Sequence, residues 1–284
     1  MQLGIFAKTF PRPTVEQTLQ AAADTGVTAV QFNLSVLGLP TVPDTVPAEA
    51  IAATREAAAR TGVELAAISG TFNTAHPDPA VRKAGVARFP VLCETASALG
   101  IPVITLSSGS RDIRDMWRYH RDNSTDAAWS DSRDSLTALA DAAAGHNVTL
   151  AVEPEHANVL ATAALARRML DEIGSPVLGI VFDAANLIDP DPATPESMRS
   201  VITQAVTLLG PDIVLAHAKE LTAGRCPVPA GAGMLPWDLI IDALDGAGFG
   251  GTLVIHGLGE PDVPLAVRTL RHAMARASRD LHRT

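Results

Sequence analysis

The chain has 284 residues, of which 47% are hydrophobic and 19% are charged, and its formal net charge is -9. This composition is typical of a folded globular protein and excludes a disordered chain. The acidic balance argues against a nucleic-acid partner, because nucleic-acid binders usually carry a basic surface. The length alone fits either two domains or one α/β barrel.

Short apolar runs alternate with longer helical stretches eight times along the chain. Strands are predicted, in chain order, at 3–10, 29–34, 64–72, 103–106, 148–152, 177–182, 213–216 and 252–255. The helices that follow them are predicted at 14–25, 47–60, 79–98, 128–144, 161–173, 195–209, 236–247 and 264–281. Thr14 is placed to cap the first helix, and Gly100 is placed to end the third.

The predicted strands are continuous apolar runs, which is typical of parallel strands buried on both faces. No Gly-, Pro- or Ser-rich linker divides the eight units, and no G-x-G-x-x-G motif follows the first strand, as a dinucleotide-binding fold requires. The sequence therefore predicts an α/β fold, a (β/α)8 TIM barrel, in which residues 1–284 form a single domain.

The sequence also predicts a cytoplasmic protein. No apolar run reaches the roughly 18 residues that would suggest a membrane span, and the first residues lack the apolar stretch of a signal peptide. Cys93 and Cys226 are too few for a disulfide framework. We expect both to be free, buried thiols in a reducing compartment, and we expect no membrane partner.

Active sites of TIM barrels lie at the carboxyl ends of the strands, and four consecutive predicted strands end in a side chain that can bind a metal. These residues are Glu153, Asp183, His217 and His256. Each alone is more often a helix cap or a structural residue. Together, however, two unpaired carboxylates at one barrel mouth would repel each other without a cation. Two carboxylates and two imidazoles suit Mn²⁺, Co²⁺ or Zn²⁺ better than Mg²⁺.

Several motifs resemble the sugar phosphate isomerase/epimerase group of xylose isomerase-like TIM barrels, which is related in fold to endonuclease IV. They are Val-Glu-Pro-Glu at 152–155, Phe-Asp-x-x-Asn at 182–186, His-Ala-Lys-Glu at 217–220, Gly-Ala-Gly at 231–233 before Trp237, and His76-Pro77-Asp78. The resemblance covers essentially the whole chain. It implies a small-molecule carbohydrate substrate and one divalent metal ion, with Mn²⁺ the first expectation.

Carried over by position, Glu153, Asp183 and His217 match three of the four metal ligands of the family. The sequence departs from the family at two positions. His256 stands where the family usually has a glutamate, and Asn186 stands where many members have a histidine. In family epimerases the two glutamates act on opposite faces of the substrate, so His256 departs from that symmetric arrangement.

The constellation predicts an isomerase or epimerase that works through a metal-stabilised enediolate. Glu153 is the first candidate for the general base, and Glu155 is the second. Glu155 and Asn186 are also expected to contact the substrate. His256 is either a metal ligand or a second acid/base. Lys219 either neutralises the enediolate and contacts a substrate hydroxyl, or forms a strand-end salt bridge with Glu220.

The stretch 107–127 is long, irregular and leaves the catalytic rim, so we interpret it as a lid. Trp117 would then cover a sugar face, and Arg111 or Arg118 would bind a phosphate or carboxylate. The alternative is a solvated loop whose aspartates balance these arginines. His76 either contacts the substrate or stabilises the turn together with Pro77.

Three other functions stay open at this stage. A metal-dependent lyase or dehydratase would end in β-elimination on a keto sugar or keto glycoside, which the His256 replacement favours. A DNA-repair enzyme of the endonuclease IV type would need further zinc ligands and a basic face. A non-catalytic sugar-binding subunit would tolerate loss of Glu153. Barrels of this kind often associate, so a homo-oligomer is a further expectation.

Overall fold

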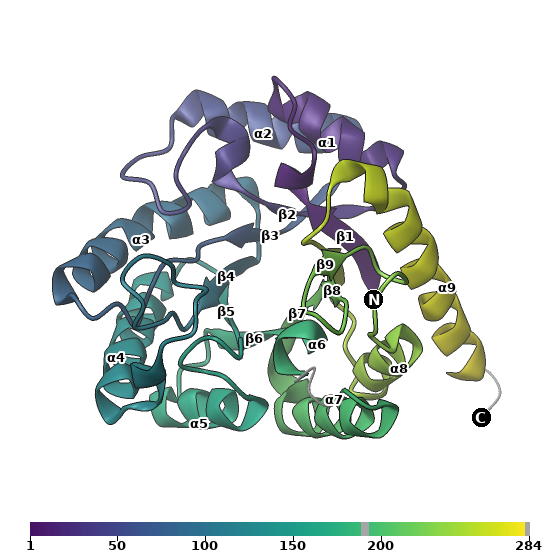
Figure 1. The fold of residues 1–284 in the computed structure, drawn as a ribbon. Coiled ribbons are helices and arrows are strands. Elements are labelled where there is room, and N and C mark those ends of the chain that lie inside the picture. Colours follow the sequence, from purple (N-terminus) through teal and green to yellow (C-terminus); the bar gives the residue numbers. More distant parts are fainter. Residues whose placement is uncertain (189–192, 282–284) are drawn as a thin grey trace.

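The structure is a computed structural model that describes residues 1–188 and 193–281. Parallel strands close into a barrel in the order β1-β10-β7-β6-β5-β4-β3-β2, and helices surround it on the outside (Figure 1). The barrel strands are β1 Gln2–Phe6, β2 Ala29–Phe32, β3 Glu64–Ser69, β4 Val103–Ser107, β5 Thr149–Glu153, β6 Leu178–Asp183, β7 Ile213–Ala218 and β10 Thr252–Ile255. The predicted (β/α)8 TIM barrel is therefore confirmed.

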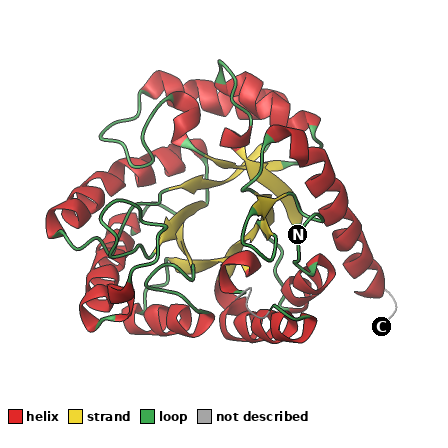
Figure 2. Ribbon diagram, in the orientation of Figure 1, coloured by secondary structure: helices red, strands yellow, loops and turns green. Residues whose placement is uncertain are grey.

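Each barrel strand is followed by a helix that packs on the outside of the sheet (Figure 2). The outer helices are α1 Val15–Asp24, α2 Ala48–Thr61, α3 Pro79–Leu99, α4 Asp126–Ala143, α5 Ala163–Ile173, α7 Pro195–Leu209, α8 Trp237–Gly246 and α9 Val263–Leu281. The predicted caps are present: the Thr14 side chain accepts from the backbone N–H of Gln17, and Gly100 ends α3 in the left-handed conformation.

The first strand is shorter than predicted. β1 ends at Phe6, and a 3-10 turn over Ala7–Thr9 follows it, closed by a bond from the Phe10 N–H to the Ala7 carbonyl. Ala7 and Phe10 are buried in this turn. The apolar residues after Phe6 therefore pack in the core as part of a turn and do not extend the strand. A short helix α6 (Ala184–Leu187) and a hairpin of β8 (Glu220–Leu221) and β9 (Pro227–Val228) were not predicted.

Two apolar clusters stabilise the fold. The larger one lies between the strands and the helices and includes Leu19, Phe89 and Leu136. The smaller one consists of strand residues alone: Ala67, Val103, Ala151, Val181, Leu215 and Val254. Side chains that point into a barrel fill it in layers, so this second cluster is one layer of the barrel interior. It forms an apolar layer beneath the carboxyl ends of the strands.

One prediction about the cysteines is wrong. Both thiols are free, and Cys93 is buried in α3, but Cys226 is exposed beside the β8–β9 hairpin. Apolar neighbours in the sequence do not imply burial here, because a two-stranded hairpin has no second layer above it. No helix within 1–188 or 193–281 is long and apolar enough to cross a membrane.

Candidate metal and substrate site

Strand geometry places the four predicted metal ligands on one level of the barrel. Side chains two residues apart on a strand point to the same face. Ala151, Val181, Leu215 and Val254 belong to the interior apolar layer, and the residues two positions later are Glu153, Asp183, His217 and His256. The four polar side chains therefore form the next layer toward the barrel mouth.

These four side chains form a compact cluster. One ligand atom from each lies within 4.8 Å of the ligand atoms of the other three. The strand register supports this arrangement, because Asp183 of β6 lies opposite His217 of β7. Glu153, Asp183 and His217 are buried and His256 is partly buried.

The donor set fits a divalent cation. Two carboxylates and two imidazoles are a common set for Mn²⁺, Co²⁺ and Zn²⁺. Buried carboxylates are unfavourable without a counter-charge, and a cation among the four donors would supply it. This cluster is the candidate metal site.

His217 is held on both sides of its ring. Its Nδ1 lies 3.1 Å from Oε1 of Glu153, and its Nε2 lies 2.9 Å from the carboxamide oxygen of Gln31. The Gln31 amide nitrogen donates to the hydroxyls of Ser69 and Thr105, at 2.9 and 3.0 Å. A metal-binding histidine is commonly oriented by such a bond at its second ring nitrogen.

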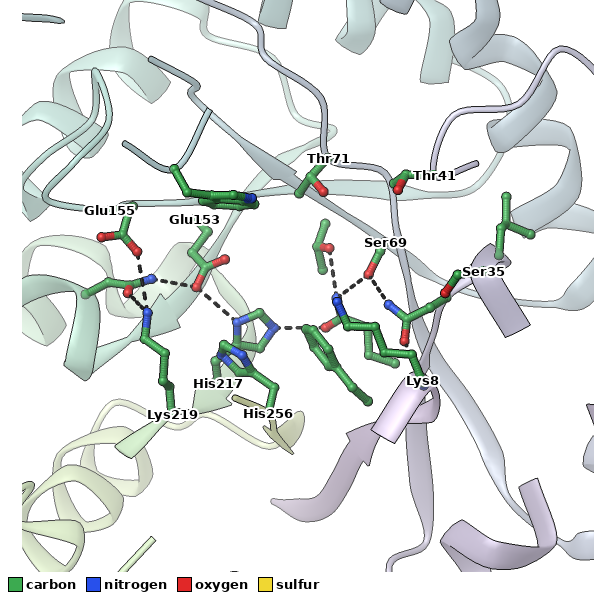
Figure 3. Close-up of a pocket in the computed structure, with 17 residues that line it drawn as sticks. Lys8, Ser35, Thr41, Ser69, Thr71, Glu153, Glu155, His217, Lys219 and His256 are labelled. Atoms are coloured by element: carbon green, nitrogen blue, oxygen red, sulfur yellow. Dashed lines mark hydrogen bonds and ion pairs between the residues drawn. The ribbon is translucent and has the colours of Figure 1, made fainter. Parts of the chain in front are cut away.

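Lys219 joins the carboxylates on the other side of the cluster (Figure 3). Its Nζ lies 3.5 Å from Oε2 of Glu155 and 3.9 Å from Oδ2 of Asp183, and it also donates to the Asn186 side-chain oxygen. The Asn186 amide donates to Oε1 of Glu153 at 2.8 Å. Asn186 thus links the ammonium group to Glu153. Lys219 forms no salt bridge with Glu220, which was one of the two predicted roles.

The electrostatics of the cluster follow from these contacts. Burial would raise the pKa of Asp183, but the charge of Lys219 and the hydrogen bond from His256 outweigh it and hold that pKa below its usual value. Burial lowers the pKa of Lys219, but Asp183 and Glu155 outweigh this effect and keep the pKa raised. Asp183 is therefore a carboxylate and Lys219 an ammonium at neutral pH.

His256 behaves differently. Burial and the neighbouring His217 lower its pKa, against the opposing hydrogen bond to Asp183 at 3.3 Å. The ring is therefore neutral near pH 7, which is the form that binds a metal. The Phe6 ring stacks on His256 with centroids 4.8 Å apart and meets the edge of His217 at 5.4 Å. Phe6 also packs on the apolar layer below, so it separates that layer from the polar site.

A cavity of about 350 Å³ opens above the cluster. Its walls include Glu153, His217 and His256, together with the predicted substrate-site residues Glu155, Asn186, Trp117 and Lys219. Trp117 is 45% exposed and reaches the cavity from the irregular stretch between β4 and α4. This stretch therefore contributes to the wall through Trp117, and the contact of Trp117 with a sugar stays a prediction. Whether the stretch closes as a lid stays a prediction.

Arg111 and His76 lie elsewhere and do not line this cavity. The Arg111 guanidinium pairs with Asp131 of α4 at 2.7 Å and donates to the Ala75 carbonyl at 3.1 Å. The His76 ring accepts from the backbone N–H of Asp78 at 3.1 Å, which fits the turn-stabilising alternative. Arg118 is largely exposed and faces Asp112 at 3.9 Å.

The Gly-Ala-Gly motif has a structural role through Glu220. This buried carboxylate accepts from Trp237 Nε1 at 2.8 Å and from the Leu235 and Gly231 backbone N–H groups at 3.0 and 3.4 Å. A Cβ at Gly233 would lie 2.4 Å from the Glu220 carboxylate. The motif therefore fixes the turn between β9 and α8.

Eight polar residues that line the cavity were not predicted, and three of them, Ser35, Thr41 and Thr71, lie after β2 and β3. Gln31, Ser69 and Thr105 point inward from β2, β3 and β4, and Asn33 and Lys8 lie just beyond β2 and β1. The same two-residue spacing identifies two of them, since Ser69 follows Ala67 and Thr105 follows Val103 in the interior layer. The sequence prediction named only the residues that end strands five to eight.

The comparisons agree on the fold. A family model described as xylose isomerase-like TIM barrel matches residues 19–277. A D-tagatose 3-epimerase-like protein is 15% identical, with TM-score 0.78 over 99% of this chain and 100% of that chain. The 3-keto-D-glucoside 4-epimerase from E. coli is 17% identical, with TM-score 0.74 over 98% and 99%.

A third similar structure is D-psicose 3-epimerase from Clostridium cellulolyticum H10, which is 18% identical, with TM-score 0.70 over 96% of this chain and 99% of that chain. No curated protein matches the sequence. At these identities the likeness to solved structures establishes the barrel fold.

Proposed function

The chain belongs to the xylose isomerase-like TIM barrel family, and we propose that it is a divalent-metal-dependent enzyme that isomerises or epimerises a carbohydrate. The observation that carries this proposal is the cluster of four donors within 4.8 Å of one another below a cavity of about 350 Å³. The similar solved structures support it, because their names describe a D-tagatose 3-epimerase-like protein, a 3-keto-D-glucoside 4-epimerase and a D-psicose 3-epimerase.

Glu153, Asp183, His217 and His256 would hold the metal ion, for which we propose Mn²⁺, with Co²⁺, Zn²⁺ and Mg²⁺ as alternatives. When bound, such an ion supplies Lewis-acid chemistry toward the carbonyl and adjacent hydroxyl of a keto sugar. His256 provides a neutral donor in the fourth position, where the family usually has a glutamate.

Glu153 is the proposed general base. Its Oε1 accepts from Asn186 Nδ2 at 2.8 Å and lies 3.1 Å from His217 Nδ1, while no partner for its Oε2 is found among the described residues. The carboxylate is therefore held at one oxygen and has the other free to take the proton next to the sugar carbonyl. Trp117 at the cavity wall would cover a face of the sugar.

Lys219 would balance the negative charge that develops on the substrate oxygen as this proton leaves. Its ammonium group lies between Glu155 and Asp183 at the edge of the cavity. Lys219 donates to Asn186, and Asn186 donates to Glu153. Asn186 therefore couples the position of the Lys219 ammonium group to that of the proposed base, Glu153. His256, neutral near pH 7, is the second candidate for proton transfer.

One feature favours a second candidate function, a lyase. The carboxylates that line the cavity in the described part of the chain are Glu153 and Glu155, both at the end of β5. An epimerase that uses one carboxylate on each face of the substrate would need a second carboxylate across the cavity from Glu153. The described lining residues include none there. Removal of the proton by Glu153 followed by loss of a β-substituent would need one carboxylate only.

Proton exchange in D₂O tests the proposal. We expect the Mn²⁺-loaded protein to incorporate deuterium at the carbon next to the carbonyl of at least one ketose or 3-keto glucoside, detected by NMR. The lyase would instead produce an enone, visible by ultraviolet absorbance. Glu153→Gln should reduce the rate about 10²- to 10⁴-fold, whereas Glu56→Gln on the exposed face of α2 should not. Absence of exchange and of elimination across neutral and anionic sugars would overturn the proposal.

A further inference from the structure

The wall of the cavity carries an exposed lysine, Lys8, for which no ion pair is found among the described side chains. Lys8 lies just after β1, and its Nζ is 5.1 Å from the centroid of the Phe6 ring. It lines the cavity above the metal cluster and also a neighbouring cavity of about 730 Å³. Among the side chains described in 1–188 and 193–277, no carboxylate forms an ion pair with Lys8; the exposed Asp262 lines only the neighbouring cavity.

Three other basic side chains near the barrel mouth are paired with carboxylates. Lys219 contacts Asp183 and Glu155, and Arg111 pairs with Asp131. Arg12, four residues after Lys8, donates from Nη1 to Glu260 at 2.9 Å. Lys8 therefore differs from these three residues, because it lines the cavity without a carboxylate partner among the described side chains.

The base of the Lys8 side chain is fixed. Its backbone N–H donates to the Asn33 side-chain oxygen at 3.2 Å, and the Asn33 amide donates to the Ser69 hydroxyl at 2.8 Å. Ser69 in turn accepts from Gln31, which contacts His217. The position of Lys8 is thus tied by hydrogen bonds to the metal cluster, and only the flexible tip of the side chain is left to adjust to a ligand.

Uncharged polar side chains share the first cavity with Lys8. Ser35, Thr41 and Thr71 line the same cavity as Lys8. Figure 3 shows Lys8, Ser35 and Ser69 on one side of His217, and Glu155 and Lys219 on the other. One end of the cavity therefore combines carboxylates with a paired lysine, and the other end combines hydroxyls with an unpaired lysine.

We propose that Lys8 binds an anionic group on the substrate, a carboxylate or a phosphate, at the end of the sugar away from Glu155 and Lys219. The substrate class is then an anionic keto sugar. A lysine ammonium group is a standard ligand for either anion, and Ser35 and Thr41, which line the same cavity, supply further hydroxyl donors. This inference rests on the proposed function and specifies its substrate.

The test compares three sugars that differ only in the group at carbon 6, which is a hydroxyl, a phosphate or a carboxylate. Fructose, fructose 6-phosphate and the corresponding 6-carboxylate, a hexuluronate, are offered to the Mn²⁺-loaded wild type, to Lys8→Met and to Lys83→Met. Lys83 is an exposed lysine of α3, so its variant has the same chemical change outside the site. Binding is measured by calorimetry, and turnover by deuterium exchange.

We expect wild type to bind one of the two anionic sugars at least about tenfold more tightly than fructose. Lys8→Met should lose about 10- to 100-fold in affinity for that sugar, the range for a hydrogen bond to a charged group, and less than about threefold for fructose. Lys8→Arg should retain part of the preference. Whichever anion suffers the larger loss identifies the distal group as phosphate or carboxylate.

The two proposals fail differently. Equal losses for neutral and anionic sugars, no loss for either, or a wild type that binds neither anionic sugar more tightly than fructose would overturn the role of Lys8. Exchange on fructose would still support the epimerase proposal in those cases. The opposite result is also possible: an anionic sugar binds tightly and depends on Lys8, but neither exchange nor elimination occurs. That result would overturn the proposed reaction and would still support the anion site at Lys8.

Discussion

The carboxamide oxygen of Gln31 lies 2.9 Å from Nε2 of His217, on the opposite side of the ring from Glu153. The amide nitrogen of Gln31 donates to the hydroxyls of Ser69 and Thr105. With its hydrogens directed at these hydroxyls, the oxygen is left to accept a hydrogen from Nε2. Gln31 thereby favours the His217 tautomer whose Nδ1 lone pair faces the metal cluster.

Gln31→Met should therefore weaken metal binding. Methionine has a similar size but cannot accept the Nε2 hydrogen, so His217 loses the bond that orients it. Loss of such a partner typically costs about 10- to 100-fold in metal affinity. Competition with a chelator for Mn²⁺ measures the change, with the exposed Gln17→Met as control. An unchanged affinity would show that the His217 tautomer is fixed in another way.

Metal removal should destabilise the fold. An ion that binds only the native state stabilises it by about 2.7 kcal/mol when present at 100 times its dissociation constant. We expect chelator-treated protein to unfold at a lower temperature and Mn²⁺, Co²⁺ or Zn²⁺ to restore the higher one. Asp183→Asn removes a charged donor and should abolish the shift. A metal-independent melting temperature in wild type would argue against the site.

Strand-end chemistry could be predicted from the sequence because it depends on local information. Each of Glu153, Asp183, His217 and His256 directly follows an apolar run, and the parallel barrel brings the ends of such runs to one rim. Gln31 obeys the same geometry, but a single amide inside a short apolar run gives no local sign that it faces a histidine 186 residues later.

The partners of charged residues could not be predicted for a similar reason. Arg111 and Trp117 lie six residues apart on one irregular stretch, yet Arg111 pairs with Asp131 while Trp117 lines the cavity. Which of them reaches the site depends on the path of the loop, and that path is fixed by side-chain bonds of Asn73 and Asn123 to backbone groups of the loop. Sequence spacing does not contain these long-range contacts.

The two thiols should react very differently. Burial raises the pKa of Cys93 to about 11, and the thiolate is the reactive form, whereas Cys226 is exposed. At pH 8 a thiol reagent should label one cysteine rapidly in the folded protein and two after denaturation. Mass spectrometry should locate the first label at Cys226. Rapid labelling of Cys93 in the native protein would contradict this.

The raised pKa of Cys93 also predicts how the free energy of unfolding changes with pH. A group whose pKa is higher in the folded state stabilises the protein below the ordinary pKa of about 9 and loses that contribution as the pH rises toward about 11. Cys93→Ala removes this effect. The free energy of unfolding of wild type should therefore fall more steeply between pH 9 and 11 than that of the variant, as measured by denaturant titration.

The turn before α8 should tolerate no side chain at Gly233. A Cβ there would lie 2.4 Å from the Glu220 carboxylate and 2.5 Å from the Leu221 carbonyl oxygen. Glu220 cannot easily move, because it also accepts from Trp237 Nε1. Gly233→Ala should therefore lower the free energy of unfolding by about 1 to 3 kcal/mol, the usual cost of overpacking.

Gly246 provides the matched control for this turn. It ends α8, and a Cβ there would meet no atom within 4 Å. Gly246→Ala should leave stability unchanged or raise it by about 0.5 to 1 kcal/mol, since alanine loses less backbone entropy in a helix. Urea titrations of both variants measure the difference. Equal effects at the two positions would mean that Glu220 and its turn relax without cost, and that the Gly-Ala-Gly motif has a role other than packing.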